Sequence, residues 1–210
     1  MPTTAPTGVY GGIPAAERRA ERRERLLDAG LEILGTEGSQ ATTVRAICQR
    51  ASLNPRYFYE SFSGLDELLV AVFERITDEA MEAVMRSAEQ NPEDPESTAR
   101  ATIGAFVELM TADPRKGRVA FIEAMGSEAL MRRRLDTLQR FAEFVAAYAR
   151  GLDGARHVDE QTVQLTAQVL VGGLTEALIA WLDGRLDVSR ERLVEHCAAL
   201  FVAATRVARP

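Results

Sequence analysis

Three pairs of residues, Asn54-Pro55, Asp94-Pro95 and Asp113-Pro114, each combine a helix-capping side chain with a proline directly after it. Asparagine and aspartate accept hydrogen bonds from the first turn of a helix. Proline suits the first helical position because its missing N–H has no partner there. Each pair therefore predicts a helix start. Since no segment alternates apolar and polar residues as a half-buried strand would, the sequence predicts an all-α fold.

About nine helices are expected from the caps, the glycine stops and the apolar periodicity. Thr42 or Thr43 can cap a short helix, and the capping-box pattern that begins at Ser63 precedes a long one. The predicted ranges are about 15–34, 43–50, 55–61, 65–89, 95–111, 114–125, 127–150, 159–183 and 189–207.

Composition and charge exclude several classes of protein. The chain is 46% hydrophobic and 27% charged, which is typical of a globular protein, and no stretch reaches the roughly 18 consecutive apolar residues of a membrane span. Residues 1–14 lack the basic start and apolar core of a signal peptide and are expected to form a disordered tail. Two distant cysteines, Cys48 and Cys197, favour a reducing cytoplasm over a disulfide framework.

The charge is unevenly distributed along the chain. The net charge is −6, yet residues 1–62 carry eight arginines and seven acidic residues, a net charge of +1. Because acidic segments repel phosphates, any nucleic-acid-binding surface is expected in this first part.

The segment LNPRYFYESF, residues 53–62, holds four of the 13 aromatic residues of the chain. At 100° per residue, Phe58 and Phe62 fall on one side of a helix, while Arg56, Tyr57 and Glu60 fall on the other. Two interpretations remain open. Either all the rings belong to the core, or the arginine–tyrosine side faces solvent, where it suits the phosphates and base edges of a DNA major groove.

A short helix, a tight turn and a second short helix form the helix-turn-helix arrangement. Cys48 is small enough for the crossing of the two helices, and Ser52 lies where the turn favours a left-handed backbone. The stretch ATTVRAICQRASLNPRYFYESFSGLDELL, residues 41–69, resembles the DNA-binding domain of the tetracycline-repressor-like (TetR) family of bacterial transcription regulators. The resemblance extends over about residues 17–75. It implies a helix-turn-helix DNA-binding domain at 15–64, followed by a ligand-binding and dimerisation domain at 65–210.

The resemblance also implies roles for single residues in this sequence. Those implied to contact phosphates are Thr43, Arg45 and Tyr59, those that would read bases are Asn54, Pro55, Arg56 and Tyr57, and Phe62 would anchor the helix. Three residues depart from the family pattern and are expected to weaken DNA binding: Ser52 replaces a turn glycine, Leu65 stands in place of a frequent lysine, and Glu60 adds a negative charge near the phosphates.

The arginine-rich run ERRAERRER, residues 17–25, has two readings. It forms a solvated helix face with local ion pairs, or it brings Arg18, Arg19 and Arg22 close to the DNA backbone. A second run, Met131 to Arg134, is expected to be a solvated face.

The last two predicted helices carry apolar stripes that fit either the core of a monomer or a four-helix bundle between two subunits. TetR-family members dimerise through their last two helices, so the resemblance implies a homodimer. The expected interface residues are Leu170, Leu174, Ala177, Trp181, Cys197, Leu200 and Phe201. The adjacent glycines Gly172 and Gly173 are expected to permit a close approach of another backbone.

The resemblance implies a small-molecule cavity among the middle helices. The large side chains expected to line it, or else to fill the core, are Phe106, Met110, Phe121, Met125, Phe144 and Tyr148. No phosphate loop, nucleophile motif or HExxH sequence is present, and His196 and Cys197 point about 100° apart on a helix, so neither an enzyme, a cofactor nor a metal site is predicted.

Two functions of different classes are compatible with these patterns. The first is a cytoplasmic, dimeric, ligand-responsive repressor that binds a palindromic DNA operator through residues 54–61 and is released by a small-molecule effector. The second is a helical module that binds proteins or sequesters small molecules without contacting DNA.

Overall fold

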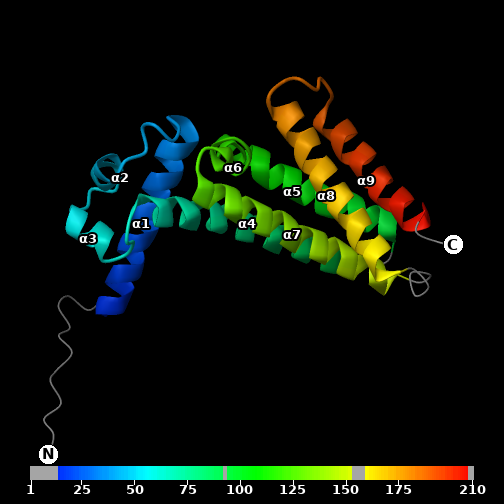
Figure 1. The fold of residues 1–210 in the computed structure, drawn as a ribbon, viewed down its shortest axis with the longest axis horizontal. Coiled ribbons are helices and arrows are strands. Elements are labelled where there is room, and N and C mark those ends of the chain that lie inside the picture. Colours follow the sequence, from blue (N-terminus) through cyan, green and yellow to red (C-terminus); the bar gives the residue numbers. More distant parts are fainter. Residues whose placement is uncertain (1–13, 92–93, 153–158, 208–210) are drawn as a thin grey trace, which may run out of the picture. The chain divides into compact units, whose positions relative to one another are not determined.

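The computed structural model of the chain describes residues 14–91, 94–152 and 159–207 (Figure 1). Over these residues it contains nine α-helices, one 3-10 helix and no strand, so the all-α prediction is confirmed. The helices are α1 (Ala15–Thr36), α2 (Val44–Arg50), α3 (Pro55–Tyr59), α4 (Leu65–Gln90), α5 (Pro95–Ala112), α6 (Pro114–Phe121), η1 (Glu123–Met125), α7 (Glu128–Gly151), α8 (Glu160–Leu182) and α9 (Arg190–Val207). Apart from Pro14, the predicted tail lies outside the described residues.

The Asx–proline pairs begin helices as predicted. The Asp94 carboxylate accepts a hydrogen bond from the Ser97 amide at 2.8 Å, and the Asp113 carboxylate accepts one from the Arg115 amide at 3.1 Å. At the start of α4 the capping partner is Glu67, whose carboxylate accepts hydrogen bonds from both the amide and the hydroxyl of Ser63.

Two compact units make up the chain, Met1–Val72 and Phe73–Pro210. The core of the first is built from α1, α2, α3 and the first two turns of α4. Gly30 of α1 permits close packing there, since a Cβ atom at this position would lie 2.7 Å from Cδ2 of Leu68. The fully buried side chains of this core include Leu26, Leu34, Ile47, Phe58 and Leu68.

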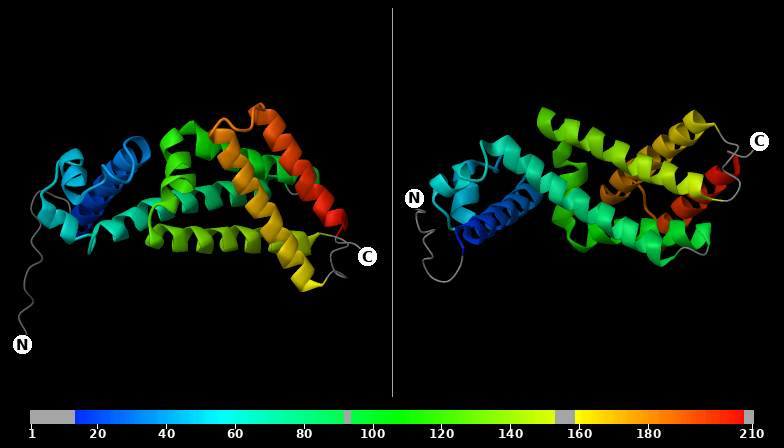
Figure 2. Two further views of the ribbon diagram at one scale, coloured as in Figure 1. Left: turned by 45° about the horizontal axis from the view of Figure 1, so that its top comes forward. Right: turned by 90° about the horizontal axis from the view of Figure 1, so that it is seen from below.

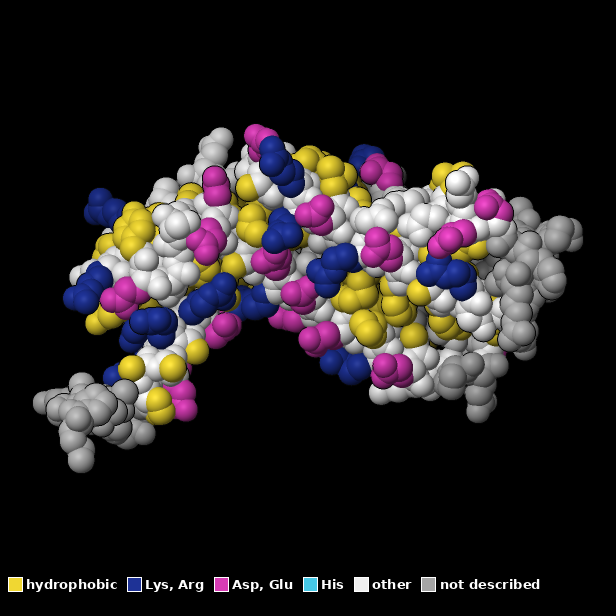
Figure 3. Space-filling model, turned by 60° about the horizontal axis from the view of Figure 1, so that its bottom comes forward, with side chains coloured by type: hydrophobic (Ala, Val, Ile, Leu, Met, Phe, Trp, Pro, Cys, Tyr) yellow, Lys and Arg dark blue, Asp and Glu magenta, His cyan; other side chains and the backbone are white. Residues whose placement is uncertain are grey.

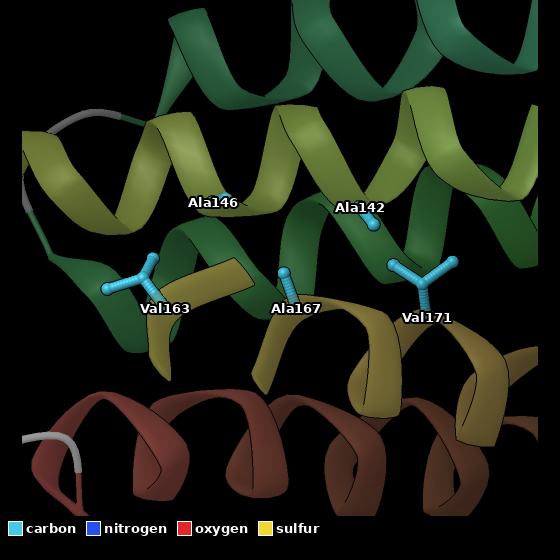
Figure 4. Packing of buried hydrophobic residues seen from close by; sticks show 5 residues of the cluster. All are labelled: Ala142, Ala146, Val163, Ala167 and Val171. Carbon is cyan, nitrogen blue, oxygen red and sulfur yellow. The ribbon is translucent and has the colours of Figure 1, made fainter. Parts of the chain in front are cut away.

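In the second unit α7 packs against α8, and α5 packs against α9 (Figure 2). Small side chains fill the first of these interfaces, where Ala142, Ala146 and Ala167 are buried together with Val163 and Val171 (Figure 4). Because the distance between two helix axes depends on the side chains at the contact, alanines bring α7 and α8 close together. The second interface carries an ion pair between Arg100 and Glu195 at 2.7 Å.

Among the described helices, α8 has the length and mean hydropathy that a membrane span requires. Length and composition alone are weak grounds for such an assignment, because the core helices of globular proteins share both properties.

Candidate nucleic-acid interface and internal cavity

A Schellman turn joins α2 to α3. The amide of Ser52 donates to the carbonyl of Gln49 at 3.1 Å, and the amide of Leu53 donates to the carbonyl of Cys48 at 2.9 Å. Ser52 has a φ of 53°, so the predicted left-handed backbone is confirmed at a residue that is not glycine. The turn directs the chain from the end of α2 straight into the cap of α3.

Both short helices have side-chain caps. The Thr43 hydroxyl oxygen accepts a hydrogen bond from the Ala46 amide at 3.1 Å, which decides between the two candidate threonines. Asn54 Oδ1 accepts one from the Arg56 amide at 2.9 Å, and Pro55 occupies the first turn of α3, as predicted. A capped helix of five residues therefore presents its side chains in a fixed orientation.

The four rings of residues 57–62 divide between core and surface. Phe58 is fully buried and Phe62 nearly so, and their ring centroids lie 5.7 Å apart. The side chain of Arg56 is 82% exposed and Tyr59 is 61% exposed, with Tyr57 also on the surface. The interpretation that all four rings belong to the core is therefore wrong, and an arginine–tyrosine face is available to a partner.

Glu60 joins the surface of α3 to α1. Its carboxylate accepts a hydrogen bond from Arg56 Nε at 3.1 Å and lies 3.6 Å from the guanidinium of Arg22. That second guanidinium lies over the Tyr57 ring, 4.5 Å from its centre. The position of the Tyr57 ring is thus supported by a cation–π contact, which orders the exposed face.

Two further arginines of α1 hold the unit together. The Arg25 guanidinium donates to the carbonyl of Ala51, the residue before the turn, and the Arg23 guanidinium lies 4.8 Å from the centre of the Phe62 ring. Neither expectation for the 17–25 run assigned these arginines such contacts. They join residues far apart in the sequence, so spacing within the run could not reveal them.

Arg45 lies exposed on α2 and has no partner within the described residues. Its guanidinium is therefore free for an external anion. Figure 3 shows arginine side chains gathered on the drawn face of the first unit, with acidic side chains between them.

Residues 26–72 match the model of the family described as bacterial regulatory proteins, tetR family. This match spans α2, the Schellman turn, α3 and the start of α4, the segment whose geometry forms the exposed face. Residues 26–72 therefore carry the DNA-binding domain of the TetR family, whose members are transcription regulators and not enzymes.

Solved structures share this TetR fold over nearly the whole chain. The fatty acid degradation regulator FadR from Bacillus halodurans superposes with a TM-score of 0.70 and 17% identity, covering 86% of this chain and 94% of that one. FadR from Bacillus subtilis in complex with stearoyl-CoA gives 0.67 and 16%, covering 86% and 98%. A TetR family regulator from Marinobacter aquaeolei VT8 gives 0.64 and 20%, covering 90% and 97%.

The second unit encloses a cavity of about 550 Å³, within the usual range for small-molecule sites. Five of the six residues predicted for a ligand pocket line it: Phe106, Met110, Phe121, Phe144 and Tyr148. Met125 does not line it, because this residue lies in η1 with its side chain exposed. Phe106 makes edge-to-face contacts with Phe121 and with Phe141, a lining residue that the sequence did not single out.

The residues expected at a subunit interface are placed differently from one another. Leu170, Leu174 and Phe201 line the cavity. Cys197 is buried and Ala177 is half-buried. Trp181 donates its indole N–H to the Val188 carbonyl at 2.8 Å. Only Leu200 is an exposed large apolar side chain. Burial raises the pKa of the Cys197 thiol, which suits a buried apolar residue rather than a reactive one.

A neighbouring stripe of α8 faces outward instead. Leu165 and Val169 are each 66% exposed, and Gly172 and Gly173 continue the same stripe, where an added Cβ atom would meet no other segment of the described chain within 4 Å. This outward stripe lies on one of the two helices for which an interface was predicted, but it is made of other residues. Among the described residues, no three His, Cys, Asp or Glu side chains gather as metal ligands.

Proposed function

We propose that this TetR-family protein is a dimeric, ligand-responsive repressor that acts in the cytoplasm. It binds a palindromic DNA operator through residues 54–61, and a small molecule in the cavity of the second unit releases it. The observation that carries the proposal is the exposed Arg56–Tyr57–Tyr59 face on a capped helix directly after the helix-turn-helix turn.

The chemistry of the exposed face supports the DNA contacts. Arg45 and Tyr59 offer a guanidinium and a phenol to phosphates, and Thr43 keeps its hydroxyl proton for the same purpose while its oxygen caps α2. At the start of α3, Asn54 has its amide NH₂ group available, because its hydrogen bond to the Arg56 backbone uses only the carbonyl oxygen. Arginine and asparagine are common readers of guanine and adenine edges.

The outward stripe of α8 supports a dimer. Exposed Leu165 and Val169, with Leu200 of α9, form an apolar surface, and Gly172 and Gly173 leave room for another backbone. Pairing these helices with their copies makes a four-helix bundle with two-fold symmetry. Two recognition helices can then read half-sites one turn of DNA apart, which is why the operator is expected to be palindromic.

The cavity and α4 support a response to a ligand. FadR from Bacillus subtilis was solved in complex with stearoyl-CoA, and the cavity of the present chain is mostly apolar. Helix α4 contributes Leu68 to the first core and Phe73, Thr77 and Val84 to the cavity wall, without a break between them. A ligand that favours one position of α4 therefore changes the affinity for DNA.

Electrophoretic mobility shift with DNA from upstream of the gene tests the DNA-binding part. The double substitution Arg45→Ala and Tyr59→Phe should weaken a specific shift at least tenfold, since it removes two phosphate contacts. A shift unaffected by this pair removes the assigned contacts, and no shift at all favours the alternative of a sequestering module. The ligand-response part predicts that DNA weakens effector binding by the same factor by which effector weakens DNA binding.

A further inference from the structure

One charged residue, Arg134, lines the cavity of the second unit within the described parts of the chain. No aspartate, glutamate or histidine lies beside it in the lining. The expectation that Met131 to Arg134 forms a solvated face is wrong for Arg134, which is half-buried and lines the cavity, whereas Arg132 and Arg133 are exposed.

The other arginines of α7 are already paired. Their carboxylate partners are Glu128 for Arg132, Glu74 and Asp136 for Arg133, Asp78 for Arg140 and Glu160 for Arg150. Arg134 alone among them has no such partner within the described residues. A half-buried guanidinium without a counter-charge is unfavourable, so this position suits an anion supplied from outside the chain.

A hydroxyl group lies next to this charge. Thr137 follows Arg134 by three residues on the same face of α7 and also lines the cavity, and its hydroxyl has no partner among the described residues. Several other lining threonines differ, because their hydroxyl protons are donated to backbone carbonyls of their own helices. Such bonds are made by Thr77, Thr98, Thr102 and Thr175. Arg134 and Thr137 therefore form a two-donor site.

The remainder of the lining is mostly apolar and elongated. Along α7 and its C-cap it extends from Arg134 to Leu152, a rise of about 27 Å. Past the two-donor site come Leu138, Phe141 and Val145. A compact polar molecule would leave most of this surface uncovered.

From this arrangement we infer that the cavity binds an amphipathic anion, with its carboxylate or phosphate group at Arg134 and Thr137 and a long aliphatic chain along α7. The inference rests on the proposed function only in taking this cavity as the effector site. Two kinds of ligand share this chemistry. One is a free long-chain carboxylic acid, and the other is a thioester of such an acid that carries phosphate groups.

Calorimetric titration of the full chain, without DNA, tests the inference with three ligands of equal chain length: dodecanoate, dodecan-1-ol and dodecanoyl-CoA. The substitution Arg134→Gln removes the charge and keeps a polar side chain, and Thr137→Val removes the hydroxyl at nearly constant shape. Arg132→Gln is the matched control, because this neighbouring arginine of α7 is exposed and paired with Glu128. Circular dichroism of each variant verifies folding.

The wild-type chain is expected to bind at least one of the two anions roughly tenfold more tightly than the neutral alcohol, since charge-assisted hydrogen bonds are the strong ones. Arg134→Gln should remove most of that preference and leave alcohol binding unchanged, Thr137→Val should reduce it a few-fold, and Arg132→Gln should not alter it. Preference for dodecanoate or for the CoA ester identifies the source. Equal binding of all three ligands, or an equal loss for anion and alcohol in Arg134→Gln, overturns the inference.

A separate titration distinguishes this inference from the proposed function. If the preferred anion binds through Arg134 but does not lower the affinity of the protein for its upstream DNA, the ligand-response part of the proposed function fails while the assigned ligand class stands. If DNA is released by a neutral or cationic compound that binds the cavity, and neither anion binds, the assigned ligand class fails and the proposed function stands.

Discussion

The Glu60 carboxylate accepts a hydrogen bond from Nε of Arg56, one helical turn earlier, at a distance of 3.1 Å. The same carboxylate lies 3.6 Å from Arg22, the arginine that covers the Tyr57 ring. A DNA phosphate must therefore compete with an internal carboxylate for both guanidinium groups. Glu60 orders the exposed face and at the same time lowers its positive potential.

Replacing Glu60 by glutamine is expected to strengthen DNA binding. The substitution frees Arg56 and removes a negative charge near the phosphates. It costs little stability, since ion pairs at the surface contribute about 0–1 kcal/mol and the Arg56 side chain of this pair is exposed. Affinity for the upstream DNA should rise about three- to tenfold at low salt, and the plot of log affinity against log salt concentration should steepen by about one unit. Fluorescence anisotropy at several salt concentrations measures both.

The control for Glu60→Gln is Glu82→Gln, which makes the same change in net charge. Glu82 pairs with Arg86 in the second unit, with both side chains exposed. If the two variants strengthen binding equally, the effect comes from overall charge and not from the release of Arg56.

A glycine at position 52 should stabilise the first unit. The serine there has a φ of 53°, a conformation that costs residues with a Cβ atom about 1–2 kcal/mol. Glycine avoids this cost, but part of the gain in stability is lost because glycine makes the unfolded chain more flexible. The free energy of unfolding of Ser52→Gly should therefore rise by about 0.5–1 kcal/mol, measured by urea denaturation. Gly38→Ser is the reciprocal test: its φ of 87° should make that substitution destabilising.

Helix starts could be predicted from the sequence because a cap is a local device. Asn54, Asp94 and Asp113 bond to amides two or three residues ahead, and proline restricts the same few residues. The inward and outward sides of α3 followed from helical periodicity for the same reason, since Phe58 and Phe62 are separated by one turn.

Contacts between distant segments could not be predicted in this way. Arg25 reaches the carbonyl of Ala51, and Arg22 reaches Tyr57 and Glu60, across more than 25 residues of sequence. Helix α8 has two apolar sides, which the sequence did not separate: Leu170 and Leu174 face a cavity, while Leu165 and Val169 face outward. Periodicity identifies an apolar side but not what covers it.

The capping carboxylate of α6 is expected to make stability depend on pH. Hydrogen bonds from the Arg115 side chain, at 2.8 and 2.9 Å, hold the pKa of the Asp113 carboxyl below its usual value. A lowered pKa in the folded state contributes stability above the unfolded pKa of about 3.9. That contribution is lost as the pH falls through the lower folded pKa.

Asp113→Asn separates this charge from the cap, because asparagine is an equally good N-cap. Near pH 7 the variant should be about 0.5–1 kcal/mol less stable than the wild type, and the difference should shrink as the pH falls below about 4. Urea denaturation across this pH range measures it. In an Arg115→Gln background, the loss of stability caused by Asp113→Asn at pH 7 should be much smaller. If the loss is unchanged, a residue other than Arg115 stabilises the Asp113 charge.

The outward stripe of α8 gives a direct test of the proposed dimer. A glutamate at Leu165 or Val169 adds no strain to the monomer, since both side chains are 66% exposed, but it places a charge with its symmetry copy in an apolar interface. Either substitution should weaken dimerisation at least a hundredfold, as measured by sedimentation equilibrium. The specific DNA shift should weaken with it, because one subunit contacts a single half-site.

Leu135→Glu is the control, since Leu135 is equally apolar and exposed but lies on α7. A dimer that persists in both α8 variants assigns the interface to another surface, and a wild-type chain that sediments as a monomer at micromolar concentration contradicts the dimer itself.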